Sequence, residues 1–424
     1  MTLERSLIYN SRGAQSATQR SQDISDLTHQ YPELLPGTTL LPGLAQISEA
    51  VTGLTSSHDP AVSELLAFGQ AAIVEKTRRG AGTVPIAAIA GGAAGEAVRL
   101  VLLRKEQSRW EDSEHIGLSL FTIKGGEEGW WSGNGTPIQQ LVFGDMDDEA
   151  TPWLAVRYGG TISILQPLLQ RGIFAPELTR PGRLQYPASR LDPNHVVTLP
   201  IQRSGGVPIV DVTFNPWDNQ QIATLDQCSR WTVWDIEMKA RKMGVWTIKR
   251  SMEGTHSNDS KQNDGESKII ADGWGAVLWA GDMNTIVVAT RTKLAVYDIR
   301  DDPEELSVPN IFSRLAIYWI LDVKTSPSDL NHVFVLTTSS IFWLHISTVR
   351  DEGDSKESKS GARCLLSWKH FRDPGDISLR MNIVLSSENT EHEENVASKS
   401  SLITPYNVLI LTIAQHSSFF FTLD

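Results

Sequence analysis

The chain has 424 residues, of which 40% are hydrophobic and 21% are charged, and its formal net charge is −12. This composition is that of a globular protein, and the acidic balance argues against a module that binds nucleic acid alone, because phosphate neutralisation needs clustered Lys and Arg. The sequence holds 13 Trp and 2 Cys. Two cysteines exclude a disulfide framework and favour a reducing compartment, the cytoplasm or the nucleus.

The first part of the chain is polar and contains two segments with helical patterning. No apolar run approaches the roughly 18 to 20 residues that cross a bilayer, so we expect no membrane association. Residues 45–54 and 60–74 are predicted to be helices. In the second, Asp59 is the expected N-cap and Pro60 the first helical residue. One helical face would carry Val62, Leu65, Leu66 and Ile73. We therefore interpret residues 1–80 as a polar, helical lead-in to a β domain over 81–424.

The clearest pattern in the β domain covers residues 207–237, which predict three short strands joined by two turns. The first strand alternates apolar and polar residues from Val210 to Phe214, and Asn215-Pro216 begins a turn. The third strand ends on Trp234-Asp235. Strand, turn, strand, turn and strand with a terminal Trp-Asp is typical of one WD-repeat blade of a β-propeller.

The same layout recurs along the chain. It is found in residues 136–165, 274–300 and 320–347, and in two pieces between 377 and 422. A meander over 84–123 supplies one more blade or the closure of the ring. The sequence therefore predicts an all-β fold, an irregular WD-repeat-like β-propeller of about six or seven blades.

Polar insertions explain why the repeats are unevenly spaced. Segments near 251–267, 350–361 and 386–401 are rich in Ser, Glu, Asp and Lys and hold almost no large apolar residue. Such a composition is typical of solvated, disordered loops.

The central blade also resembles a known family more closely than a generic WD repeat. The residues that carry the resemblance form an FNPW turn, an Asp eight residues before the last Trp, and a W-x-x-WDI strand. They are Phe214, Asn215, Pro216, Trp217, Asp226, Trp231, Trp234 and Asp235. In this order and spacing they resemble the propeller subunit of the fungal RNA polymerase I core initiation factor. The close match covers about thirty residues. Members of that family are longer than this chain, which suggests an N-terminal fragment.

The resemblance implies a function, partners and a location. The function is that of a non-enzymatic scaffold in the core factor, which recruits RNA polymerase I to ribosomal-DNA promoters. The implied partners are the other core-factor subunits, the TATA-binding protein and the polymerase, with promoter DNA contacted mainly through the assembly. The implied location is the nucleolus. Two alternatives remain open, a generic WD-like adaptor and a propeller hydrolase with its site in the central channel.

The sequence contains no pattern that predicts catalysis. It has no G-x-S-x-G elbow, no HExxH and no repeated set of acidic or His residues at the predicted strand starts. We therefore expect no enzyme activity, no cofactor and no metal.

Two groups of side chains are candidates for contacts with partners. The densest basic segment is a candidate for binding a nucleic-acid backbone or an acidic partner, although an exposed outer strand of the central blade is the favoured explanation. It contains Lys239, Arg241, Lys242, Lys249 and Arg250. Trp130 and Trp131 are either an exposed anchor or packed between blades. Trp217 and Trp234 are both predicted to be buried.

Overall fold

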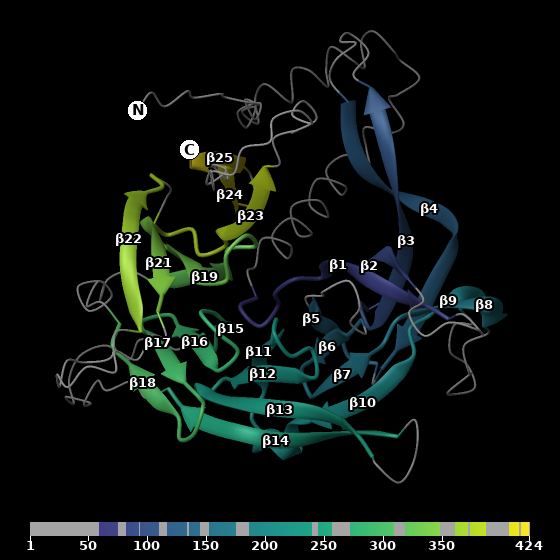
Figure 1. Ribbon diagram of the computed structural model, residues 1–424, viewed down its shortest axis with the longest axis horizontal. Coiled ribbons are helices and arrows are strands. Elements are labelled where there is room, and N and C mark those ends of the chain that lie inside the picture. Colours follow the sequence, from purple (N-terminus) through teal and green to yellow (C-terminus); the bar gives the residue numbers. More distant parts are fainter. Residues whose placement is uncertain are drawn as a thin grey trace, which may run out of the picture. The chain divides into compact units, whose positions relative to one another are not determined.

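In the computed structural model, the regular secondary structure of the described residues is almost entirely β-strand (Figure 1). The described residues are 59–74, 82–92, 94–109, 117–133, 135–144, 152–174, 186–239, 245–256, 272–308, 319–347, 361–371, 374–386, 407–414 and 417–423. They belong to two compact units, Pro60–Pro374 and one that includes Gly375–Asp424. The helix predicted at 45–54 lies outside the described residues.

Five sheets form the first unit. The first sheet has the order β4-β3-β2-β1-β8-β9, with β1 Leu66–Ile73, β2 Thr83–Gly91, β3 Ala97–Arg109, β4 Gly117–Ser132, β8 Leu168–Phe174 and β9 Ser189–Asp192. The second has the order β10-β7-β6-β5, with β5 Ile138–Phe143, β6 Leu154–Tyr158, β7 Thr161–Leu165 and β10 His195–Pro200. A short 3-10 helix, η2 Ile201–Ser204, follows β10.

The next three sheets each contain four strands in sequence order. The third sheet consists of β11 Ile209–Phe214, β12 Gln221–Asp226, β13 Arg230–Met238 and β14 Trp246–Thr255. The fourth consists of β15 Gly275–Trp279, β16 Thr285–Thr290, β17 Leu294–Asp298 and β18 Glu304–Leu306. The fifth consists of β19 Ile320–Thr325, β20 His332–Thr337, β21 Ser340–Ile346 and β22 Ala362–Lys369.

The second unit contributes a sixth sheet, β23-β24-β25, with the bounds Arg380–Ser386, Asn407–Ala414 and Ser417–Leu423. The strand-turn-strand repeats predicted from the sequence are thus confirmed, as is the all-β fold class. The described pairings are antiparallel except for one short parallel pair, β1 with β8, at Ala72↔Leu168 and Ile73↔Leu169.

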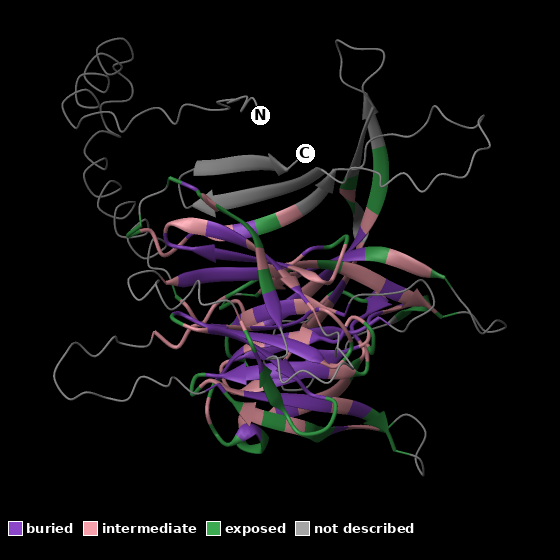
Figure 2. Cartoon of the chain, turned by 60° about the vertical axis from the view of Figure 1, so that its left-hand side comes forward, coloured by how far each residue is buried: buried purple, intermediate pink, exposed green. Residues whose placement is uncertain are grey.

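The hydrophobic core of the first unit is divided into layers, each lying between two consecutive sheets. One cluster joins the first and second sheets, and three more join the second to the third, the third to the fourth and the fourth to the fifth. The middle strands are buried along their whole length, as β6 and β16 show, whereas the outermost β14 and β22 have one buried residue each. Figure 2 shows the buried residues gathered inside the stacked sheets. Sheets packed face to face in series are the architecture of a propeller.

The helix predicted over 60–74 is wrong, because residues 66–73 form β1. This strand pairs with β2 from Leu66↔Ile89 to Ala72↔Thr83. Ala and Gly dominate its inward face, and Ala favours helices when it is free of tertiary contacts. Small side chains also let two strands pack closely against a neighbouring sheet, and here pairing with β2 decides the conformation. The sheet region therefore begins before residue 81.

One predicted insertion is shorter than expected. Residues 251–255 belong to β14, and Trp231↔Gly254 and Arg230↔Thr255 are pairs in its ladder with β13. Residues 257–267, 350–360 and 387–401 lie outside the described residues. Among the residues described, no helix is long and apolar enough to cross a membrane.

Candidate functional site

Three turns at one end of the first strands share the same local geometry. They are residues 215–220 after β11, 281–284 after β15 and 326–331 after β19, and we call them together the turn face. Each holds an Asp whose carboxylate accepts the backbone N–H two residues later. These bonds are Gln220 N to Asp218 at 3.0 Å, Asn284 N to Asp282 at 2.9 Å and Asn331 N to Asp329 at 2.9 Å. The sequence signal is Asp-x-Asn/Gln, which promotes an Asx turn.

Hydrogen bonds also connect the three turns to one another. The buried Asn215 donates its amide to the backbone oxygen of Met283, at 3.0 Å, and Gly281 N donates to the backbone oxygen of Leu330, also at 3.0 Å. Asn215 Oδ1 accepts the N–H of Trp217 at 3.0 Å. The position of each turn is therefore fixed by its neighbour, and the surface is preorganised.

Two large apolar side chains lie exposed at the tips of these turns. Trp217 is 42% exposed and Met283 is 49% exposed. The prediction that Trp217 is buried is therefore wrong. The turn, rather than the core, sets its direction, because Pro216 follows the end of β11 and the ladder does not continue to residue 217. Exposed Trp side chains on rigid turns are typical of contact surfaces.

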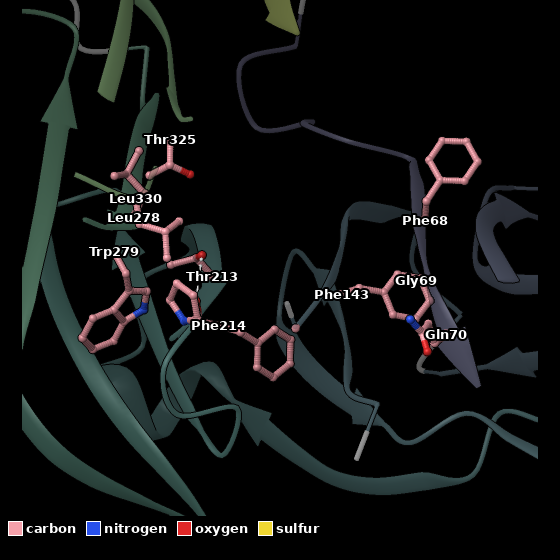
Figure 3. A pocket seen from close by; sticks show the side chains of 12 residues that line it. Phe68, Gly69, Gln70, Phe143, Thr213, Phe214, Leu278, Trp279, Thr325 and Leu330 are labelled. Atoms are coloured by element: carbon pink, nitrogen blue, oxygen red, sulfur yellow. Dashed lines mark hydrogen bonds between the residues drawn. The ribbon is translucent and has the colours of Figure 1, made fainter. Parts of the chain in front are cut away.

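A pocket of about 290 Å³ opens beside the turn face (Figure 3). Its lining is mostly aromatic and aliphatic, with Phe68 and Phe143 on one side and Trp279 and Leu330 on the other, and Phe214 between them. Phe68 is 64% exposed. Three polar side chains, Gln70, Thr213 and Thr325, also line the pocket. The aromatic and aliphatic side chains of this lining offer contacts to one or two apolar side chains of a ligand.

A network of polar groups, some of them buried, ties the first strands of the sheets together. Arg157 is fully buried and donates to Gln140 Oε1 at 2.9 Å, to the backbone oxygen of Ile209 at 2.9 Å and to that of Ala61 at 2.8 Å. Gln140 in turn donates to Asp211 at 2.6 Å. Lys324 and Glu64 form an ion pair between β19 and the segment before β1.

Asp211 is the acidic centre of this network. It accepts the N–H of Val277 at 2.7 Å as well as the Gln140 amide. Burial raises the pKa of Asp211 to about 6, although these two hydrogen bonds act in the opposite direction. Asp322 occupies the matching position in β19, in Ile320-Leu-Asp-Val as against Ile209-Val-Asp-Val. We did not recognise this repeat in the sequence.

The network connects sheets and does not resemble a catalytic centre. The carboxylate of Asp211 accepts hydrogen bonds from groups on three different sheets, and Arg157 reaches backbone oxygens. Among the described residues, no three His, Cys, Asp or Glu side chains are grouped so that they could hold a metal ion. The arrangement gives no support to the hydrolase alternative.

The signature residues of the third sheet divide between core and surface. Phe214, Trp231 and Trp234 are buried, and the prediction for Trp234 is confirmed at 2% exposure. Trp234 Nε1 donates to Thr224 at 3.0 Å, which retains the Trp–Thr part of a WD-repeat network. Asp226 accepts the N–H groups of Cys228 and Arg230 at 2.9 Å in the β12–β13 turn.

The remaining signature side chains lie nearer the surface. Asp235 accepts the Gln221 amide at 3.0 Å, and Pro216 lines the pocket. The Trp130–Trp131 pair packs rather than projecting outward, since Trp130 stacks on Tyr186 and Trp131 on His195 with ring centroids 5.2 and 5.4 Å apart.

The basic segment does not form one cationic patch among the described residues. Lys239 and Lys249 are exposed, but Arg250 pairs with Glu253 at 2.9 Å and lies over the ring of Trp234. Arg241 and Lys242 lie outside the described residues. Because Lys249 and Arg250 belong to β14, the alternative interpretation as an exposed outer strand is correct for that part of the segment.

Comparisons with known proteins agree with this fold. A family model described as "Rrn6, beta-propeller" matches residues 59–412. The chain belongs to the Rrn6 β-propeller family. A relative from Saccharomyces cerevisiae, named RNA polymerase I-specific transcription initiation factor RRN6, is 26% identical over 176 residues, which are 41% of this chain and 17% of that protein.

A solved structure also resembles this member of the Rrn6 β-propeller family. It is the crystal structure of the S. cerevisiae core factor, and the match has a TM-score of 0.54 at 14% identity. The match covers 87% of this chain and 51% of that chain. The likeness shows that the fold is shared, and this chain spans about half the length of the structure that it matches.

Proposed function

We propose that this chain is the propeller part of a promoter-recognition factor for RNA polymerase I. In this role it is a non-enzymatic scaffold that assembles partner subunits and recruits the polymerase to start transcription of ribosomal RNA genes. The observation that carries the proposal is the match of the Rrn6 β-propeller model to residues 59–412. The name of the yeast relative gives the polymerase.

The geometry supports a binding role rather than a reaction. The turn face presents exposed Trp217 and Met283 on turns held together by hydrogen bonds. The buried polar groups nearby, Arg157 and Asp211, bond to other parts of the fold. On this proposal the partners are the other core-factor subunits, the TATA-binding protein and RNA polymerase I. The protein acts in the nucleolus, within the nucleus.

Co-purification tests the proposal. The endogenous protein, tagged at its own locus, is isolated at physiological salt and its partners are identified by mass spectrometry. We expect core-factor subunits and RNA polymerase I subunits, enriched over a control tag. Recovery of an unrelated complex without any RNA polymerase I component would favour the generic adaptor and reject the proposal.

A further inference from the structure

We propose that the turn face and its pocket bind an extended segment of a partner protein, in which one large apolar side chain stands next to Lys or Arg. This deepens the proposed function, and rests on it only for the identity of the partner. The binding chemistry itself follows from the side chains on the surface.

The pocket fixes the apolar part of the ligand. Its volume of about 290 Å³ lies at the lower end of ligand pockets, and four of its twelve lining residues are aromatic. Trp217 and Met283 extend the apolar surface beyond the pocket, and both are substantially exposed. A Trp, Phe or Leu side chain of the partner would fill the pocket, while its neighbours contact Trp217 and Met283.

The carboxylates of the turn face determine which partner residues stand beside the apolar side chain in the pocket. Of the three turn carboxylates, Asp282 forms an ion pair with Arg300. Among the described residues, Asp218 has no ion pair and Asp329 pairs with His332 alone, at 3.6 Å. Two carboxylates without a Lys or Arg partner, beside an apolar pocket, favour a segment that supplies those cations.

The turn face is also rigid enough to recognise an extended segment. The bonds from Asn215 to Met283 and from Gly281 to Leu330 hold the turns in place before any partner arrives. Preorganisation of this kind reduces the entropy lost on binding. Turns that were bonded only within their own sheets would lose more entropy when a partner binds.

Site-specific cross-linking in cells identifies the occupant. The photoreactive residue p-benzoylphenylalanine replaces Trp217 in the full chain, and the cross-linked peptide is sequenced. The matched control carries it at Ile173, which is exposed on β8 and lines no part of the pocket. We expect position 217 to capture a partner segment with an aromatic or aliphatic residue beside Lys or Arg, and position 173 not to capture it.

Binding of the captured segment, made as a synthetic peptide, then tests the chemistry. Trp217→Ala should weaken binding at least tenfold, as truncation of an interface Trp often does. Asp218→Asn keeps the acceptor for Gln220 N but removes the charge, so we expect a loss of about threefold that disappears at high salt. Ile173→Ala should bind like wild type.

The outcomes separate the two proposals. If the chain co-purifies with RNA polymerase I components but position 217 captures only other parts of this same chain, or nothing beyond the control, the inference is wrong and the proposed function stands. If position 217 captures a basic-apolar segment of a protein unrelated to RNA polymerase I, the inference stands and the proposed function falls. Unchanged affinity of Trp217→Ala would also reject the inference.

Discussion

At the scale of single residues, two tryptophans of the third sheet illustrate opposite roles. Trp234 is buried and donates to Thr224, whereas Trp217 is exposed on the turn face. The sequence predicts burial for both, because the flanking turn and strand leave each indole little else to cover. What separates them is the ladder, which includes Trp234 opposite Ile222 but ends at Phe214, before residue 217.

Truncation of these two residues should therefore have different effects on stability. We expect Trp234→Ala to lower the free energy of unfolding by about 3 to 5 kcal/mol, the usual range for a buried large aromatic. Trp217→Ala should change it by about 0.5 kcal/mol or less, as for other surface sites. Urea unfolding followed by fluorescence and circular dichroism measures both. A loss at Trp217 equal to that at Trp234 would contradict the assignment of Trp217 to the surface.

His256 makes stability depend on pH. It is buried against Tyr297, 3.1 Å from the phenolic oxygen. Burial lowers the pKa of His256 from 6.5 to about 4; Lys293 acts in the same direction and Glu305 against it. The unfolded chain then binds a proton at a pH where the folded chain does not, so stability is lost as pH falls from about 6.5 to about 4.

His256→Gln should flatten this dependence. The difference in the free energy of unfolding between variant and wild type should change by on the order of 3 kcal/mol between pH of about 6.5 and about 4, since one pKa unit corresponds to about 1.4 kcal/mol. Urea unfolding at several pH values gives the two curves. Asp211, whose raised pKa has the opposite effect, is common to both proteins. Parallel curves would show that His256 is not buried in its neutral form.

At the scale of elements, β1 lies unusually close to the second sheet. A Cβ added at Gly69 would lie 2.3 Å from the ring of Phe143, so the strand and this ring cannot both keep their places. We expect Gly69→Ala to destabilise the protein by about 1 to 3 kcal/mol through overpacking. Gly82→Ala is the matched control, because nothing lies within 4 Å of its added Cβ. Thermal unfolding compares them, and equal midpoints would disprove the close approach.

The strands could be predicted where apolar and polar residues alternate along the chain or where the whole strand is apolar. In the predicted repeat over 136–165, the structure has β5 Ile138–Phe143 and β7 Thr161–Leu165, and Gly159-Gly160 forms the hairpin between β6 and β7. β1 could not be predicted, because LAFGQAAI has the local preferences of a helix and becomes a strand only through pairing with β2. The hydrogen bonds that decide between helix and strand come from residues of β2, which lie outside the segment itself.

The candidate site was predicted only in part for a similar reason. The sequence predicts the turn that starts at Asn215-Pro216. The repeated Asp-x-Asn/Gln can be found by aligning 218–220, 282–284 and 329–331. The pocket could not, because Phe68, Phe214 and Leu330 come from three sheets. Their proximity depends on how the sheets pack.

At the scale of the whole molecule, charge decides how the chain meets DNA. Acidic side chains number 50 and basic ones 38. Among the described residues of the basic segment, Arg250 forms an ion pair with Glu253, and Lys239 and Lys249 are exposed. A protein that contacts six to ten phosphates loses roughly 10³ to 10⁵ in affinity between 50 and 200 mM salt. The isolated chain should therefore show no useful affinity for ribosomal promoter DNA at physiological salt.

Fluorescence anisotropy with a labelled promoter duplex measures this, and a duplex of scrambled sequence is the control. Submicromolar binding by the chain alone would overturn the scaffold role. It would make Lys239, Arg241, Lys242, Lys249 and Arg250 the residues to mutate first.

The bonds that join the turns have a consequence for how this protein can change over evolution. Asn215 and Gly281 both donate to backbone oxygens, those of Met283 and Leu330, so the bonds do not depend on which side chains those two positions carry. Met283 and Leu330 can be replaced without loosening the turns. If the turn face binds a partner as proposed, substitutions at these two positions can change what it recognises while the bonds between the turns are kept.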